Sequence, residues 1–121
     1  MSLKKIKGGN PKNFDTIIGS STVFNGNIES EGIIRIDGKV NGDVKTNSDV
    51  FVGGNAQITG NIYASNVYIS GTVKGNISSS GFVRIFSTAK LLGDIEVKSF
   101  VSDEGAIFQG KCKMIEEETS E

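Results

Sequence analysis

A tetrapeptide recurs along the chain and constrains the fold more than any other feature of the sequence. In the five complete copies, a Gly is followed by Asn or Asp and then by Ile or Val. The copies are Asn25-Gly26-Asn27-Ile28, Asn41-Gly42-Asp43-Val44, Thr59-Gly60-Asn61-Ile62, Lys74-Gly75-Asn76-Ile77 and Leu92-Gly93-Asp94-Ile95, with a decayed copy at Gln109-Gly110-Lys111-Cys112. Successive glycines lie 16, 18, 15, 18 and 17 residues apart. Units this short bury their apolar side only by stacking on one another.

Apolar residues occupy fixed positions in this repeat. Two residues before the glycine stand Phe24, Val40, Ile58, Val73, Leu91 and Phe108, and two residues after it stand Ile28, Val44, Ile62, Ile77, Ile95 and Cys112. A second alternating segment precedes the glycine, as in Ile34-Arg35-Ile36, Val50-Phe51-Val52, Val67-Tyr68-Ile69 and Val83-Arg84-Ile85. Alternation at period 2 is typical of strands with one buried face. The pattern predicts two or three short strands per repeat.

The repeat is too short to hold a strand and a crossover helix. Good helix formers are also scarce, because Leu, Ala and Met together number nine against 25 Ile and Val. With one repeat per turn, equivalent residues stack as parallel strands about 4.8 Å apart. We predict an all-β fold, a right-handed triangular parallel β-helix of about six turns. The variable spacing favours the right-handed form over left-handed hexapeptide solenoids, which prefer turns of about 18 residues.

Two short tails flank the repeats. We expect a β-helix domain over residues 14–115, a flexible basic tail over residues 1–13 and an acidic tail over residues 116–121, both tails disordered. The first contains Lys4, Lys5, Lys7 and Lys12 without an acid. Neither tail is long or apolar enough to form an obvious cap for the solenoid.

Uncapped ends predict self-assembly. The end of a β-helix is an open strand edge that pairs with similar edges, and natural proteins usually block it. A stack that accepts another stack at both ends extends into a filament without a ligand. The alternative is a monomer whose acidic C-terminal tail folds over the last turn.

The residue inventory argues against an enzyme. The chain has no His and no Trp and a single Cys, so it lacks the usual general base and any thiolate zinc site. Acyltransferases with hexapeptide β-helices need a His, and polysaccharide lyases need long loops that form a cleft. Thirteen Lys and Arg balance fourteen Asp and Glu, which gives no sign of a nucleic-acid partner. We predict no catalytic residues, no cofactor and no metal.

Three groups of motifs occur in combination along the chain. They are Thr16-Ile17-Ile18-Gly19 with Gly26-Asn27-Ile28, Gly32-Ile33-Ile34-Arg35-Ile36-Asp37-Gly38 with Gly42-Asp43-Val44, and Gly105-Ala106-Ile107-Phe108-Gln109-Gly110. In this combination the chain resembles the bactofilins, a family of small bacterial cytoskeletal proteins, over about residues 14–115. The resemblance implies a right-handed triangular β-helix that joins end to end into non-polar filaments without nucleotide, with a scaffold role in cell shape, wall synthesis, stalks or polar organelles.

The resemblance also implies where the filament joins. Family filaments join through the first and last turns, so Phe108 and Phe100 are the candidates in the last turn and Ile17, Ile18 and Phe24 in the first. Phe108 is also the last member of an apolar column, so a core role and an interface role are both expected of it. Cell-wall enzymes or polar proteins are the further partners that the family suggests.

Family members often bind the inner face of the cell membrane through the N-terminal tail. Here Leu3 and Ile6 are candidates for insertion into lipid, and Lys4, Lys5 and Lys7 for contact with anionic headgroups. The alternative is a solvated basic tail. No apolar run approaches a transmembrane helix and no secretory signal is evident, so we expect a cytoplasmic protein associated with the membrane.

Two motifs imitate ligand sites. Gly105 to Lys111 has the spacing of a phosphate-binding loop, but Cys112 replaces the Ser or Thr that would hold magnesium, so we predict no nucleotide. The Asn/Asp column after the glycines is mostly neutral, which favours hydrogen-bonded stacking or turn propensity over calcium.

A second class of function stays open. Most outward positions are polar, and Phe51, Tyr68 and Phe82 are the exceptions. They leave room for a non-polymerising β-helical adaptor that docks a partner protein on its outer face.

Overall fold

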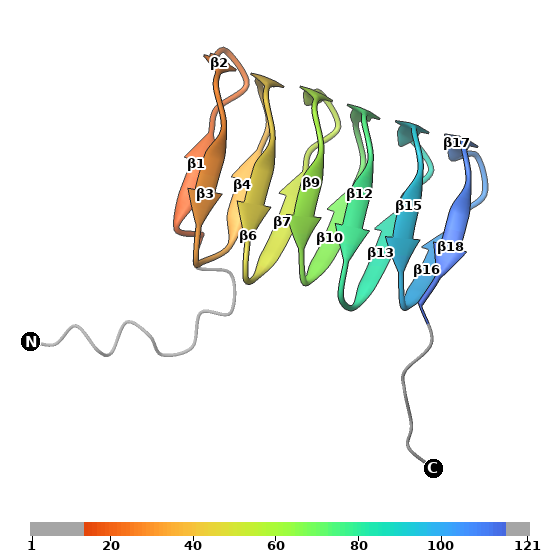
Figure 1. The fold of residues 1–121 in the computed structure, drawn as a ribbon. Coiled ribbons are helices and arrows are strands. Elements are labelled where there is room, and N and C mark those ends of the chain that lie inside the picture. Colours follow the sequence, from red (N-terminus) through yellow and green to blue (C-terminus); the bar gives the residue numbers. More distant parts are fainter. Residues whose placement is uncertain (1–13, 116–121) are drawn as a thin grey trace, which may run out of the picture.

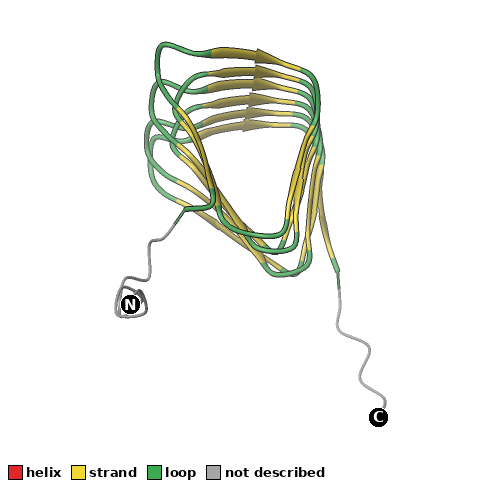
Figure 2. Cartoon of the chain, turned by 90° about the vertical axis from the view of Figure 1, so that its left-hand side faces the viewer, coloured by secondary structure: helices red, strands yellow, loops and turns green. Residues whose placement is uncertain are grey.

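The computed structural model describes residues 14–115, which form a three-sided solenoid of six turns (Figure 1). Seen along the axis from the N-terminal end, its cross-section is triangular and the chain runs clockwise as it recedes (Figure 2). The coil is therefore right-handed. The predicted fold class is confirmed, and the sequence expectation of two or three strands per repeat resolves to three.

Each side of the triangle is a six-stranded parallel sheet. Sheet A contains β1 (Thr16–Ile18), β4 (Ile34–Ile36), β7 (Asp49–Val52), β10 (Asn66–Ile69), β13 (Phe82–Ile85) and β16 (Ser99–Ser102). Sheet B contains β2 (Val23–Asn25), β5 (Lys39–Asn41), β8 (Gln57–Thr59), β11 (Thr72–Lys74), β14 (Lys90–Leu92) and β17 (Ile107–Gln109). Sheet C contains β3 (Ile28–Ser30), β6 (Val44–Thr46), β9 (Ile62–Ala64), β12 (Ile77–Ser79), β15 (Ile95–Val97) and β18 (Cys112–Met114).

The core is built from the apolar columns of the repeat. In sheet B, Val40, Ile58, Val73 and Leu91 stack in register and are fully buried. Sheets A and C each contribute two buried columns, and the second column of sheet C contains Thr46, Ala64, Ser79 and Val97. Burying one such side chain stabilises the fold by about 1.5–3 kcal/mol relative to leaving it in water. Because every turn contributes the same few positions, the core is a continuous rod along the axis.

The repeat glycine is required by the corner between sheets B and C. Gly60 has φ +150°, and a Cβ there would lie 2.0 Å from the carbonyl oxygen of Gly42 in the turn before. Any side chain would therefore both strain the backbone and collide with the neighbouring turn. The close approach recurs at the repeat glycines after the first turn, and at Gly26, which has no turn before it within the described residues, the positive φ alone favours glycine.

Buried hydroxyl groups support the corner between sheets C and A. The Thr46 hydroxyl donates to the carbonyl oxygen of Gly32 at 2.6 Å, and the Ser79 hydroxyl donates to that of Ser65 at 2.6 Å. Both residues are buried. The hydrogen bond from each hydroxyl to a backbone carbonyl of the turn before offsets the cost of burying the hydroxyl group.

Candidate polymer interface

The last turn ends the solenoid with two aromatic side chains in contact. Phe100 lies in register with the buried Val83, and Phe108 with the buried Leu91. Their ring centroids are 5.5 Å apart, and both rings pack against the core while staying partly exposed. The core role expected for Phe108 is confirmed. Its role in a filament joint stays a prediction.

The third side of the last turn is less covered. Met114 continues the column of the fully buried Val97 but is 51% exposed, and Cys112 continues the column of Ile95 and is also exposed. In an interior turn these positions are covered from both sides. The last turn thus presents an apolar end surface, formed by Phe100, Phe108, Cys112 and Met114, which we call the C-terminal end face.

The first turn presents a smaller apolar end. Ile18 is in register with Ile36, and Phe24 with Val40, and both are partly buried against the core. Ile28, the third inward residue of this turn, is only 8% exposed. We call Ile18, Phe24 and Ile28 the N-terminal end face.

Ile17 differs from its neighbours in orientation. It is in register with Arg35, an outward position of sheet A, and is 61% exposed. It therefore lies on the side wall of the first turn and not on the end face. Its proposed part in the joint would need a contact at the rim of the interface.

Both ends leave strand backbones unpaired within residues 14–115. In the interior, the Gly60 N–H donates to the Lys74 carbonyl oxygen at 2.9 Å, and equivalent bonds link the other turns. The strands β1, β2 and β3 pair only with the second turn, and β16, β17 and β18 only with the fifth. Each end therefore carries a ring of strand N–H and C=O groups on its outer side that an added strand would satisfy.

A ladder of side-chain hydrogen bonds follows the glycine column. The oxygen of each Asn or Asp accepts the backbone N–H of the equivalent residue in the next turn, at 2.9–3.1 Å. The acceptors, in chain order, are the side-chain Oδ1 atoms of Asn27, Asp43, Asn61, Asn76 and Asp94. The column is a hydrogen-bonded stack, as the sequence suggested, although the donors are backbone groups rather than side-chain amides.

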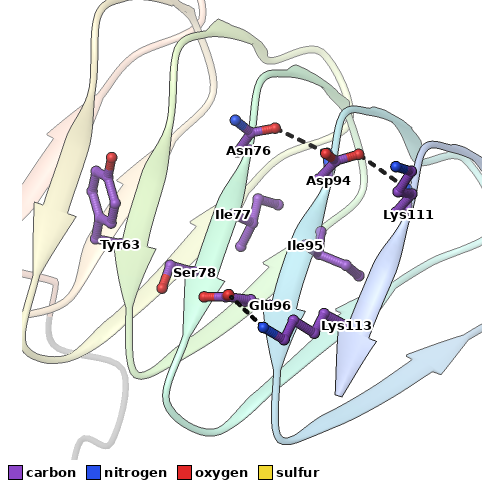
Figure 3. Close-up of a pocket in the computed structure, with 9 residues that line it drawn as sticks. All are labelled: Tyr63, Asn76, Ile77, Ser78, Asp94, Ile95, Glu96, Lys111 and Lys113. Atoms are coloured by element: carbon purple, nitrogen blue, oxygen red, sulfur yellow. Dashed lines mark hydrogen bonds and ion pairs between the residues drawn. The ribbon is translucent and has the colours of Figure 1, made fainter. Parts of the chain in front are cut away.

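This ladder has a direction and it stops at the last turn. The final donor is the N–H of Lys111, whose side chain has no acceptor atom for a further turn (Figure 3). At the other end, Asn27 supplies an acceptor to the second turn, and no earlier turn within the described residues supplies one to its own N–H. The two ends are thus not complementary in this respect.

The segment with the spacing of a phosphate-binding loop forms strands in the structure. Gly105 to Cys112 contains strand β17 and the start of β18, so it does not form a loop before a helix. A shallow groove of about 340 Å³ lies beside it on sheet C, flanked by Tyr63 and by the Glu96–Lys113 ion pair at 3.8 Å (Figure 3). Among residues 14–115, His, Cys, Asp and Glu form no group of three that could hold a metal ion.

The three outward aromatics lie together on sheet A, joined by a fourth. Phe51 and Tyr68 stack with ring centroids 4.5 Å apart and planes 3° apart, and Phe82 meets Tyr68 edge-on at 5.3 Å. Phe14 meets Phe51 edge-on at 5.6 Å. We call these four residues the aromatic stripe. Burial, with a smaller contribution from the nearby Asp49 carboxylate, raises the pKa of Tyr68.

The predicted membrane-binding residues lie outside the described residues. This applies to Leu3, Lys4, Lys5, Ile6 and Lys7. In the part of the chain that the structure describes, no helix is long and apolar enough to cross a bilayer.

The amino-acid sequence matches a family of polymer-forming proteins. The family model described as bactofilin, polymer-forming cytoskeletal, matches residues 16–113. Bactofilin BacO of Myxococcus xanthus is 33% identical over 100 residues, which cover 83% of this chain and 79% of that protein. Bactofilin BacP of the same organism is 25% identical over 100 residues, and the match spans 42% of its length.

A solved structure shares the fold. The chain is similar to a cryo-EM reconstruction of Thermus thermophilus bactofilin double helical filaments, with a TM-score of 0.77 and 30% sequence identity. The match covers 80% of this chain and 96% of the other. The protein in that reconstruction was therefore observed as a filament.

Proposed function

The chain belongs to the bactofilin family of polymer-forming cytoskeletal proteins, and from this premise we propose that it assembles end to end into filaments by joining like ends, without nucleotide. The observation that carries the proposal is that both terminal turns combine unpaired strand backbones with partly exposed apolar side chains. An added turn would complete the backbone hydrogen bonds and cover these side chains at once.

The hydrogen-bond ladder does not continue across a joint of either kind. In a head-to-tail joint, Lys111 of one copy would precede Asn27 of the next, and the Asn27 N–H would meet no side-chain acceptor. A joint between two N-terminal ends would leave the same N–H without one, because Asn27 Oδ1 already accepts the Asp43 N–H of its own chain. The ladder therefore does not distinguish the two arrangements. A filament built from C-terminal to C-terminal and N-terminal to N-terminal joints has no polarity.

Side-chain volume argues against a head-to-tail joint. A head-to-tail joint would place Phe108 of one copy directly before Phe24 of the next, because both occupy the sheet B column. The interior of that column holds only Val, Ile and Leu. Two successive Phe rings in a cross-section filled by aliphatic side chains would overpack it.

The proposed cellular role is a scaffold at the inner face of the cell membrane. The basic and apolar residues of the N-terminal segment support attachment, since each Lys contributes about 1 kcal/mol near an anionic leaflet. A filament displays many copies of the segment, and multivalency strengthens weak binding. Attached filaments would organise proteins of cell shape or wall synthesis.

Negative-stain electron microscopy of the purified chain, with no nucleotide or metal added, tests the proposal. Thin filaments of indefinite length are expected. Discrete particles across a range of salt and micromolar protein concentrations would overturn it and would favour the non-polymerising adaptor. Deleting residues 2–7 tests the attachment, because the deletion should abolish sedimentation with anionic liposomes and leave filaments intact.

A further inference from the structure

The aromatic stripe is a set of contacting aromatic rings on the outer side of sheet A, where Ile17 and Val101 are exposed as well. Its four rings form one continuous set of contacts from Phe14 to Phe82, and all four residues are partly exposed. Stacked rings on the outside of a solenoid add nothing to its core, which the inward columns already fill. Aromatic surface that stays exposed in this way is typical of a docking site.

The position of Phe14 indicates what covers the stripe. Phe14 precedes β1 in the first turn, yet its ring contacts Phe51 in β7, in the third turn. The chain therefore enters the solenoid from above sheet A and already over the stripe. Thirteen residues precede Phe14 in the sequence.

We propose that residues 1–13 fold back over the aromatic stripe of the same chain, with Leu3 and Ile6 on the rings and the lysine side chains toward the carboxylates beside the stripe. The stripe extends about 10 Å along the axis from Phe51 to Phe82, which is two turns of about 4.8 Å. An extended segment of thirteen residues reaches about 43 Å. The segment is long enough to cover every ring.

The positive charge of residues 1–13 supports their docking on the aromatic stripe. The segment contains four lysines and no acid. On sheet A, the guanidinium groups of Arg35 and Arg84 are already paired with Asp37 and Asp103, at 3.0 and 3.1 Å.

The corner at which the strands of sheet A begin adds three carboxylates, those of Asp15, Glu31 and Asp49. Lysine ammonium groups are attracted to these carboxylates over distances of about a Debye length. The proposal goes beyond filament formation and does not depend on it.

The stripe and a membrane would then compete for the same segment. Leu3, Ile6 and the lysines cannot insert into a bilayer and cover the stripe at the same time.

Site-specific photo-crosslinking tests the proposal. Ile6 is replaced by p-benzoylphenylalanine in the full chain, an equal mixture of ¹⁴N- and ¹⁵N-labelled protein is irradiated without lipid, and crosslinked peptides are identified by mass spectrometry. We expect crosslinks to peptides that contain Phe51, Tyr68 or Phe82, within chains of one isotope. Crosslinks between isotopes would mean that a neighbouring copy is the occupant, and crosslinks to the Tyr63 side would place the segment on sheet C. Either result would overturn the proposal.

Matched variants identify the contacts. The pair Phe51→Ser and Tyr68→Ser should lower the yield about tenfold through lost apolar contacts, whereas Tyr63→Ser, on the outward side of sheet C, should leave it unchanged. Replacing Lys4, Lys5 and Lys7 by Gln lowers the yield without altering the solenoid itself. A yield that none of these changes affects would refute the docking. Micrographs of the same samples keep the two proposals apart, since filaments without the crosslink refute only the docked segment.

Discussion

The two ends of the solenoid expose similar backbones but different side chains. At the N-terminal end face, Ile18 and Phe24 are partly buried and Ile28 is almost completely so. At the C-terminal end face, Phe100 and Phe108 touch each other, and Met114 is 51% exposed. The C-terminal joint would therefore bury more apolar surface.

This difference separates two contributions to assembly. Strand edges at both ends allow pairing with another strand, and they do so with little selectivity because any edge carries the same groups. In the proposed filament, the side chains of the end faces decide which edge is accepted. A solenoid with identical repeats throughout would have complementary ends and would grow head to tail. Here the terminal repeats depart from the pattern at Phe24 and Phe108, and two successive Phe rings in one column argue against a head-to-tail joint.

The largest loss of filament formation is expected when a charge is placed at the centre of the C-terminal end face. Phe108→Arg should abolish filaments, because each joint would then bury guanidinium groups without partners at a cost of several kcal/mol. Electron microscopy and sedimentation measure the loss, while circular dichroism should keep its β-sheet spectrum. Gln109→Arg, one residue away on the exposed side of β17, is the matched control and should still polymerise. Filaments that persist in Phe108→Arg would exclude this face from the joint.

The size of the blocked species should show which ends pair. If like ends join, Phe108→Arg leaves the N-terminal joint intact and the variant should be a dimer of twice the 12.8 kDa chain. Phe24→Arg should likewise leave dimers joined through C-terminal end faces. The double variant should be a monomer and provides the reference in native mass spectrometry. Monomers from both single variants would establish a head-to-tail filament instead.

The glycine column allows the same substitution to be compared in an interior turn and at an end. Gly60→Ala strains a positive φ and also drives a Cβ into the Gly42 carbonyl oxygen. At Gly26, φ is +132° and the nearest atom to a new Cβ is on the Phe24 ring at 3.9 Å. Strain alone costs about 1–3 kcal/mol, so Gly26→Ala should lose about that much. Gly60→Ala should lose at least about 2 kcal/mol more, given the usual cost of overpacking.

Denaturant unfolding in the background of the double variant Phe24→Arg and Phe108→Arg, which should be a monomer, measures both losses without a contribution from association. Equal losses at the two positions would mean that the interior backbone shifts to accommodate the added carbon. In that case the contact with the preceding turn would not explain why the repeat keeps its glycine.

Much of the fold was predictable, because a repeated pattern states the same information several times. The columns through Val40 and Val44 identified the buried faces of sheets B and C, and the segments around Arg35 identified sheet A. The same alignment could have placed Ile17 correctly, since it corresponds to Arg35, an outward residue. Its apolar character suggested an end-face role that its position in the strand does not support.

Features that occur once were not predictable. The contact between Phe14 and Phe51 joins a residue outside the repeats to one two turns away, and no periodicity encodes it. The buried hydroxyls of Thr46 and Ser79 depend on the exact corner geometry of their own turns. For the candidate interface, the sequence identified Phe100, Phe108, Ile18 and Phe24, while the end of the ladder at Lys111 emerged only from hydrogen-bond distances.

The smallest expected change in critical concentration comes from a substitution of Lys111, at the end of the hydrogen-bond ladder. Lys111→Asn supplies the acceptor that the last turn lacks. In a head-to-tail filament it would accept the Asn27 N–H of the next copy, and one hydrogen bond of about 1 kcal/mol would lower the critical concentration about fivefold. Where like ends join, no such donor lies opposite, so the critical concentration should stay within about twofold of that of Lys111→Ala, which removes the same charge without adding an acceptor. Sedimentation over a dilution series measures both variants. A difference of about fivefold between Asn and Ala would mean that the ladder crosses the joint, and the two ends would then be complementary despite their different side chains.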